Sequence, residues 1–222
     1  ASVPIGGKYR IIDFDLSNMS NSGISNVGIV AKSNFQSLMD HVGSGSAYDL
    51  SKRRSNLSIL PPYDGKAFSS FVETIYNMHG YIEHCREEYV LISQGNVITN
   101  IDYTDVFDFH SKKKADITLI YKNHAIPQGY DRPITLDVDN DGKVNQIFVK
   151  PGVVDKGVFN HAYGSILIKK DLLMSEIRNA ISVNQLDVRR LIQSSLGKYS
   201  IYAYENKGYC AAISSINDYF EF

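Results

Sequence analysis

Apolar residues recur along the chain at two alternating spacings. In residues 11–23 the apolar positions Ile12, Leu16 and Met19 follow helical spacing, and Gly23 ends the pattern. The β-branched run at 26–32 is typical of a strand buried in a parallel sheet, and residues 35–42 predict a short helix. Residues 43–66 hold several glycines and prolines and predict a long irregular segment.

A longer helix is predicted from residue 68 onward. Ser70 and Glu73 have the spacing of a capping box, in which each residue satisfies a free amide of the other at the helix start. The apolar residues of this helix are Phe68, Phe71, Val72, Ile75, Met78 and Ile82. It leads into EEYVLISQGNVITNID at 87–102, which predicts a buried strand, a Gly-Asn turn and a second helix opening at Asp102.

The second half continues the alternation. Further helices are predicted at 102–113, 171–181 and 187–196, and strands at 115–122, 163–169, 200–205 and 209–214. Residues 134–150 predict a hairpin closed at Asp141-Gly142. Strands alternating with helices predict an α/β fold with a mostly parallel sheet and helices on both faces, in which the hairpin is an antiparallel excursion.

Composition narrows the class of protein. The 222 residues are 43% hydrophobic, enough to bury one large core or two small ones. Lys and Arg number 23 against 24 Asp and Glu, without a basic stripe, which argues against nucleic-acid or anionic-membrane partners. No apolar run approaches the roughly 18 residues of a membrane span. The two cysteines, Cys85 and Cys210, form no Cys-x-x-Cys pair, so we expect a reduced, cytoplasmic protein.

Several short motifs suggest chemistry but fit poorly. Residues 137–142 (DVDNDG) match the first half of a calcium loop, yet Phe148 stands where the loop needs a Glu. Residues 5–9 (IGGKY) resemble the tail of a P-loop but lack its first Gly and have Tyr9 in place of Ser or Thr. His79 and His84 lie too far around one helix to share a metal ion. We interpret the other four histidines as surface or hydrogen-bonded core residues.

One long stretch of sequence identifies a protein family much more specifically than these short motifs do. Residues 6–30 (GGKYRIIDFDLSNMSNSGISNVGIV) closely resemble the sugar-nucleotide pyrophosphorylases, in particular the glucose-1-phosphate adenylyltransferases. The resemblance continues at 37–42, 87–96, 150–151, 163–168 and 215–220. It implies a Rossmann-like nucleotidyltransferase domain over 1–222. It also implies that the Gly-rich nucleotide strand and loop of the family precede Ala1, and that its left-handed β-helix follows Phe222.

The resemblance further implies a reaction and a metal. In this family glucose 1-phosphate attacks the α-phosphorus of ATP, giving ADP-glucose and pyrophosphate for glycogen biosynthesis, and two Asp residues hold Mg²⁺. Those two positions fall here on Asn96 and Ala212. Because an amide is a weak ligand and a methyl group is none, loss of the metal is expected to cost on the order of 10³ or more in rate.

Other family positions are altered as well. The Gly-Thr before the long helix falls on Ser70-Phe71, the Glu of the sugar contact on Val149, the Phe-Gly-Val sugar loop on 133–135, and the sugar-side Ser on Ala162. Lys150 remains as a candidate sugar-phosphate contact, and Gly164 and Ser70 are the other candidate substrate-binding positions, in a degenerate pocket.

The resemblance therefore implies a non-catalytic regulatory subunit, without a metal of its own, that joins a catalytic subunit in a hetero-oligomer. Two alternatives stay open. In the first, the chain is an active enzyme whose Mg²⁺ is held by Asp102 or Asp105. In the second, it is a sensor that binds a nucleotide or a sugar phosphate.

Overall fold

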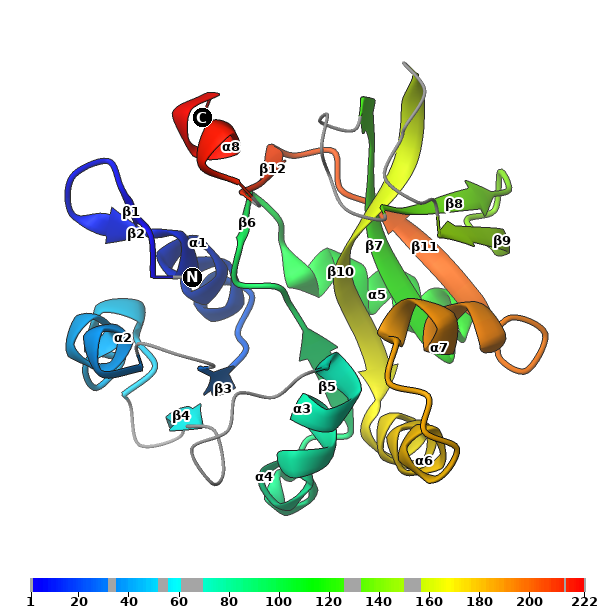
Figure 1. The fold of residues 1–222 in the computed structure, drawn as a ribbon, viewed down its shortest axis with the longest axis horizontal. Helices are drawn as coiled ribbons and strands as arrows, with labels where there is room; N and C mark the ends of the chain where they lie inside the picture. Colours follow the sequence, from blue (N-terminus) through cyan, green and yellow to red (C-terminus); the bar gives the residue numbers. More distant parts are fainter. Residues whose placement is uncertain are drawn as a thin grey trace.

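The computed structural model describes residues 2–31, 35–51, 56–60, 70–125, 133–149, 157–213 and 215–221 (Figure 1). The helices are α1 Ile11–Asn21, α2 Phe35–Val42, the 3-10 turn η1 Ser46–Tyr48, α3 Phe71–Asn77, α4 His79–His84, α5 Tyr103–Lys113, α6 Lys170–Ser182, α7 Val188–Ser194 and α8 Ile216–Glu221. The strands are β1 Pro4–Ile5, β2 Tyr9–Arg10, β3 Asn26–Val30, β4 Asn56–Leu60, β5 Tyr89–Ile92, β6 Val97–Thr99, β7 Ile117–Ala125, β8 Ile134–Val138, β9 Val144–Val149, β10 Val158–Lys169, β11 Ile201–Glu205 and β12 Cys210–Ala212.

The central sheet has six strands in the order β11-β7-β10-β8-β9, with β5 also paired to β10. The prediction of a mostly parallel sheet is wrong for the strand pairing of this sheet. Among its described strands, β11 and β7 are the only parallel pair. The reason is β10, which lies between β5 and β7 and runs against both. Since β5 and β7 both oppose β10, they share one direction with β11, and a single reversed strand makes most contacts antiparallel.

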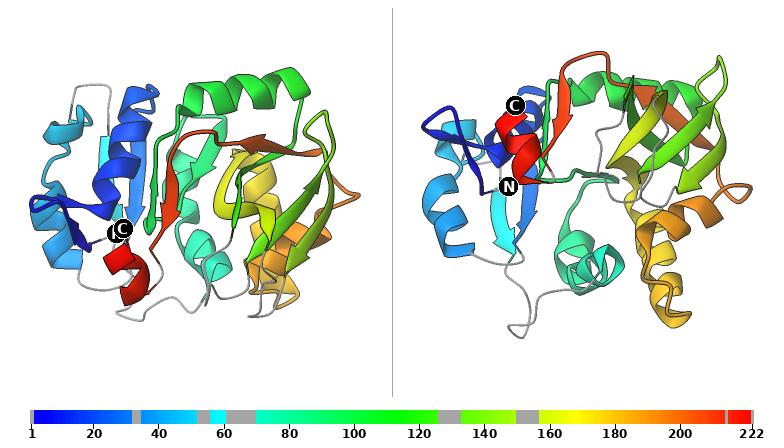
Figure 2. Two further views of the ribbon diagram at one scale, coloured as in Figure 1. Left: turned by 90° about the horizontal axis from the view of Figure 1, so that it is seen from above. Right: turned by 45° about the horizontal axis from the view of Figure 1, so that its top comes forward.

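Helices cover both faces of this sheet, as predicted (Figure 2). One face packs against α3, α4, α6 and α7 through a core that includes Val72, Leu119, Ile166, Ile177 and Ile201. The opposite face packs against α5 through Tyr103, Val106, Ile120 and Leu167. Neighbouring residues Ile166 and Leu167 of β10 thus belong to different cores, because side chains alternate across a strand.

A second, smaller sheet stands beside the first. β3 pairs in parallel with β4, which confirms the parallel strand predicted at 26–32 and shows that the segment 43–66, predicted to be irregular, contains both η1 and a strand. Asn26 at the start of β3 donates a hydrogen bond to Glu87, just before β5. Nevertheless, among the described residues no backbone pairing joins β3 to β5, so each strand has one unpaired edge.

The predicted capping box is confirmed, although the helix behind it is divided into α3 and α4 at Met78. The Ser70 hydroxyl accepts from the Glu73 amide at 3.1 Å, and the Glu73 carboxylate accepts from the Ser70 amide at 3.0 Å. The hairpin at Asp141-Gly142 is likewise confirmed, with β8 and β9 paired and Gly142 at a φ of 85°.

Replacing Ser70 with Ala should lower the free energy of unfolding by about 1 kcal/mol, because the first turn of α3 loses its cap. Urea unfolding measures this change. Ser175→Ala is the control: Ser175 is an exposed serine inside α6, so its loss should change stability by less than about 0.5 kcal/mol. Equal effects of the two substitutions would contradict the capping role.

Candidate functional site

The structure brings Asn96 and Ala212 together. Asn96 is half-buried in the turn between β5 and β6, and Ala212 is buried in β12, which pairs with β6 opposite Val97. The amide of Ile213 donates to the Asn96 carbonyl at 2.8 Å, and the Asn96 side-chain amide donates to the Ile213 carbonyl at 3.4 Å. Two positions far apart in sequence therefore lie side by side where β5 ends.

Gly164 belongs to the same region. Its φ is 81°, a backbone conformation that favours glycine, and a Cβ built there would lie 2.1 Å from the Gln94 side-chain nitrogen. Gln94 is two residues before Asn96. The Gln94 side chain thus packs directly against the β10 backbone at Gly164, where a larger residue would require it to move.

The donor set of this region does not suit Mg²⁺. This ion prefers anionic oxygen ligands in an octahedral arrangement, whereas Asn96 offers a neutral amide and Ala212 a methyl group. Within the described ranges, no three His, Cys, Asp or Glu side chains are grouped as a metal ion would need. Asp102 caps α5, where its carboxylate accepts from the Thr104 amide at 2.8 Å, and this bond lowers its pKa. Asp105 is exposed one turn further along the same helix.

A buried carboxyl group that the sequence did not single out lies close by. Asp15 of α1 is 4% exposed, and its Oδ1 accepts from the Ser93 hydroxyl at 3.2 Å, three residues before Asn96. Burial raises the pKa of Asp15 to about 7, against the opposing effect of that hydrogen bond. The sequence of α1 did not predict this, because the hydrogen-bond partner of Asp15, Ser93, is 78 residues away.

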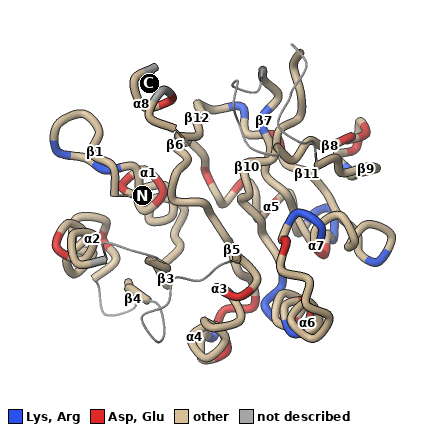
Figure 3. Tube along the Cα trace, in the orientation of Figure 1, with Lys and Arg blue, Asp and Glu red and all other residues tan. Residues whose placement is uncertain are grey.

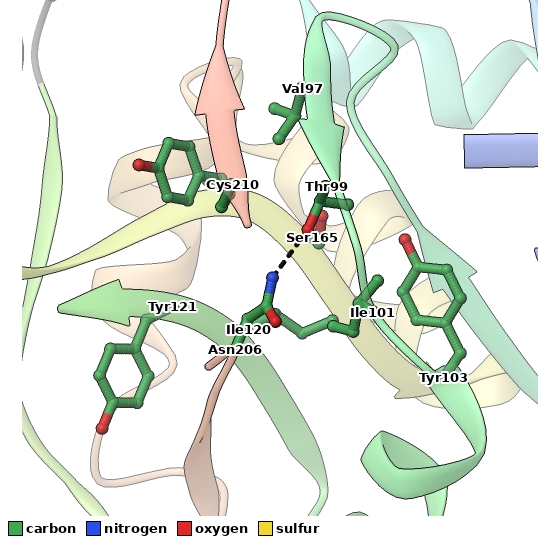
Figure 4. A pocket seen from close by; sticks show the side chains of 10 residues that line it. Val97, Thr99, Ile101, Tyr103, Ile120, Tyr121, Ser165, Asn206 and Cys210 are labelled. Carbon is green, nitrogen blue, oxygen red and sulfur yellow. Dashed lines mark hydrogen bonds between the residues drawn. The ribbon is translucent and has the colours of Figure 1, made fainter. Parts of the chain in front are cut away.

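A small cavity lies between the β6–β12 pair and the central sheet (Figure 4). Its volume of about 10 Å³ is room for one water molecule. The Asn206 side chain donates to the Thr99 hydroxyl at 2.7 Å across it. The residues that line it are Val97, Thr99, Ile101, Tyr103, Ile120, Tyr121, Tyr163, Ser165, Asn206 and Cys210.

A larger hollow of about 300 Å³ lies at the starts of β3 and β4, away from Asn96, beside Asn26, Asn56, Tyr81, His84 and Cys85.

Two candidate substrate-binding positions remain, Lys150 and Ser70. Lys150 lies outside the described residues. Ser70 is engaged in the α3 cap, so its hydroxyl already has two hydrogen bonds with Glu73.

Two of the four histidines that we interpreted as surface or hydrogen-bonded core residues have clear hydrogen-bond partners. His41 is bonded to Asp13, and the buried His110 is bonded to Thr118 at 2.7 Å, so the interpretation fits both. The structure also joins two histidines, His124 and His161, that are scattered in the sequence.

Among the described residues, the distribution of charge, the thiols and the hydropathy of the helices do not point to any further site. Acidic and basic residues are interspersed along the described trace (Figure 3). Cys85 and Cys210 are both free thiols. In the part of the chain that the structure describes, no helix has the length and apolarity needed to cross a membrane.

Comparison with known proteins identifies the family. The model of the nucleotidyl transferase family matches residues 1–208. A glucose-1-phosphate adenylyltransferase of Clostridium acetobutylicum is 33% identical over 99% of this chain and 59% of its own length, and one of Bacillus subtilis is 32% identical over 99% and 59%. The chain therefore spans about three fifths of the length of these relatives.

Solved structures share the fold. A Bacillus anthracis protein assigned as a glucose-1-phosphate thymidylyltransferase superposes with a TM-score of 0.76, at 12% identity, over 99% of this chain and 82% of its own. HddC from Yersinia pseudotuberculosis gives a TM-score of 0.67, at 15% identity, over 99% and 86%. With the adenylyltransferases similar along its whole length and the nucleotidyltransferase fold in place, this chain belongs to the nucleotidyl transferase family.

Proposed function

We propose that this chain is the nucleotidyltransferase-like domain of a non-catalytic, regulatory subunit of a glucose-1-phosphate adenylyltransferase in glycogen biosynthesis, of the GlgD kind. The adjacency of Asn96 and Ala212 carries the proposal. The two positions that the family resemblance assigns to the metal-binding carboxylates lie side by side here as an amide and a methyl group. Phosphoryl chemistry depends on a Mg²⁺ clamp to stabilise charge on the transferring phosphate, so a pocket that cannot hold the ion cannot run the reaction at an enzymatic rate.

The full-length protein is proposed to be cytoplasmic and longer at both ends. The edges of β3 and β5 that no described strand pairs with are consistent with the strand before Ala1 that the family resemblance implies. At the other end, α8 exposes Ile216 by 71% and Phe220 by 78%, on one side of the helix. Apolar residues presented in this way support a further domain beyond Phe222.

The partner of this subunit is proposed to be a catalytic homologue, and the role of this chain is to change that homologue's activity. A domain that keeps its core and loses its ligands retains surfaces for assembly while contributing no chemistry. The alternative in which Asp102 holds the metal is less well supported, because that carboxylate caps α5.

An activity assay tests the proposal. The full-length protein alone should convert ATP and glucose 1-phosphate at least about 10³-fold more slowly than a catalytic homologue from the same organism. Co-expressed with that homologue, it should co-purify and alter the rate or the apparent substrate affinity of the pair. Turnover by the protein alone at a rate comparable with that of the homologue would overturn the proposal. Calorimetric titration with ATP, glucose 1-phosphate and fructose 1,6-bisphosphate separates a sensor from an inert scaffold.

A further inference from the structure

A cluster of three polar aromatic side chains lies on one face of the central sheet. His124 is at the end of β7, and His161 and Tyr163 are on β10. In the antiparallel register His161 faces Lys122 and Phe159 faces His124, so the two histidines project from the same side of adjacent strands. Tyr163 is two residues beyond His161 and lies on that side as well.

Polar atoms of the three rings converge on one point. Nε2 of His124 is 3.3 Å from Nδ1 of His161, and it also contacts the hydroxyl of Tyr163. The ring centroids of the two histidines are 5.5 Å apart, and those of His161 and Tyr163 are 4.4 Å apart. An imidazole nitrogen carries either one proton or one lone pair, so a single Nε2 cannot form a full hydrogen bond with both neighbours at once.

The His161 side chain is completely buried, with its ring beside that of His124. A neutral imidazole offers a lone pair, which is the form that binds a metal ion.

The distance between the two histidine nitrogens fits two ligands of one tetrahedral zinc ion. Two nitrogens that each lie 2.0–2.1 Å from a tetrahedral zinc are about 3.3 to 3.4 Å apart. Nδ1 of His161 and Nε2 of His124 have this separation. The Tyr163 hydroxyl, which also interacts with the Cys210 thiol, supplies a third donor on the same side.

We propose that His124, His161 and Tyr163 form a site for a divalent first-row transition ion of the zinc type. On binding, the two imidazole lone pairs and the phenolate oxygen coordinate the ion, and the phenol proton is released to solvent. Nitrogen donors favour zinc over Mg²⁺, so this site is chemically distinct from the position of Asn96 and Ala212. It does not depend on the proposed regulatory role.

Cobalt spectroscopy and zinc calorimetry test the site. Full-length protein stripped with EDTA should bind one Co²⁺ per chain with the visible absorption of tetrahedral cobalt, and Zn²⁺ should displace it. His124→Ala and Tyr163→Phe should each weaken Zn²⁺ binding at least about tenfold, since each removes a donor. Tyr163→Phe keeps the ring and removes only the oxygen, so it remains informative if the histidine variant folds poorly.

The control is the double variant His79→Ala and His84→Ala, which removes two exposed imidazoles from α4 and should leave Zn²⁺ binding unchanged. The proposal is overturned if the unsubstituted protein shows no saturable binding, if the control variant abolishes binding, or if either donor variant binds as tightly as the unsubstituted protein. None of these results bears on the activity assay, so the two proposals fail separately.

Discussion

Replacing Asp15 with Asn should stabilise the protein at neutral and alkaline pH and change little near pH 4. Burial raises the pKa of Asp15 from 3.8 to about 7, so between these values the folded state keeps a proton that the unfolded state has released. The contribution of Asp15 to stability is therefore most favourable below about pH 4 and falls as the pH rises to about 7. A shift of about three pKa units corresponds to about 4 kcal/mol of stability that the unsubstituted protein loses over this pH range. The Asp15→Asn variant does not lose it, because its amide does not ionise.

Urea unfolding from pH 4 to pH 8 measures this difference in the free energy of unfolding between the two proteins. Asp13→Asn is the matched control, because Asp13 is buried on the same helix and accepts hydrogen bonds from the Arg10 amide and the Tyr48 hydroxyl. It also contacts His41 at 2.7 Å, so its substitution should destabilise. If the gain in the free energy of unfolding caused by Asp15→Asn does not increase from pH 4 to pH 8, Asp15 does not have the raised pKa.

Restoring both carboxylates, by Asn96→Asp together with Ala212→Asp, should make the stability of the protein depend on Mg²⁺. Ala212 is 8% exposed and lies beside the Asn96 turn, so two negative charges brought together there should lower the free energy of unfolding by about 2–4 kcal/mol without metal. Mg²⁺ at about 100 times its dissociation constant should then stabilise the folded double variant by about 2.7 kcal/mol. Thermal unfolding in EDTA and in Mg²⁺ measures the effect.

The control for this pair is Asn96→Asp with Ala212→Asn, which has the same shape and only one charge and should respond much less to Mg²⁺. The unsubstituted protein should show no response. A Mg²⁺-dependent transition in the unsubstituted protein would instead favour the alternative in which Asp102 or Asp105 binds the metal.

Local sequence patterns predicted most elements but not how strands pair. The periodicity at 115–122 and 163–169 identified β7 and part of β10, yet nothing within either run shows that β10 is reversed. Direction depends on the route of the chain through the hairpin β8–β9 and back between β5 and β7, which is a property of the whole topology. The capping box at Ser70 was predictable because both of its partners lie within one helical turn.

The contrast between local patterns and long-range contacts applies to the candidate site as well. Asn96 and Ala212 were paired through resemblance to a family, and the structure brings them together through the β6–β12 pairing. His124 and His161 are 37 residues apart and meet only through the register of β7 and β10. No periodicity within one segment could have joined them, and the same holds for Asp15 and Ser93.

The edges that β3 and β5 leave unpaired have a practical consequence. Their main-chain amides and carbonyls, unmatched by any described strand, can template an added strand from any extended segment of suitable length. In a concentrated preparation of residues 1–222 the most abundant source of such a segment is a neighbouring molecule. Self-association that increases with concentration should therefore begin at these two edges, and a short peptide that occupies them should suppress it.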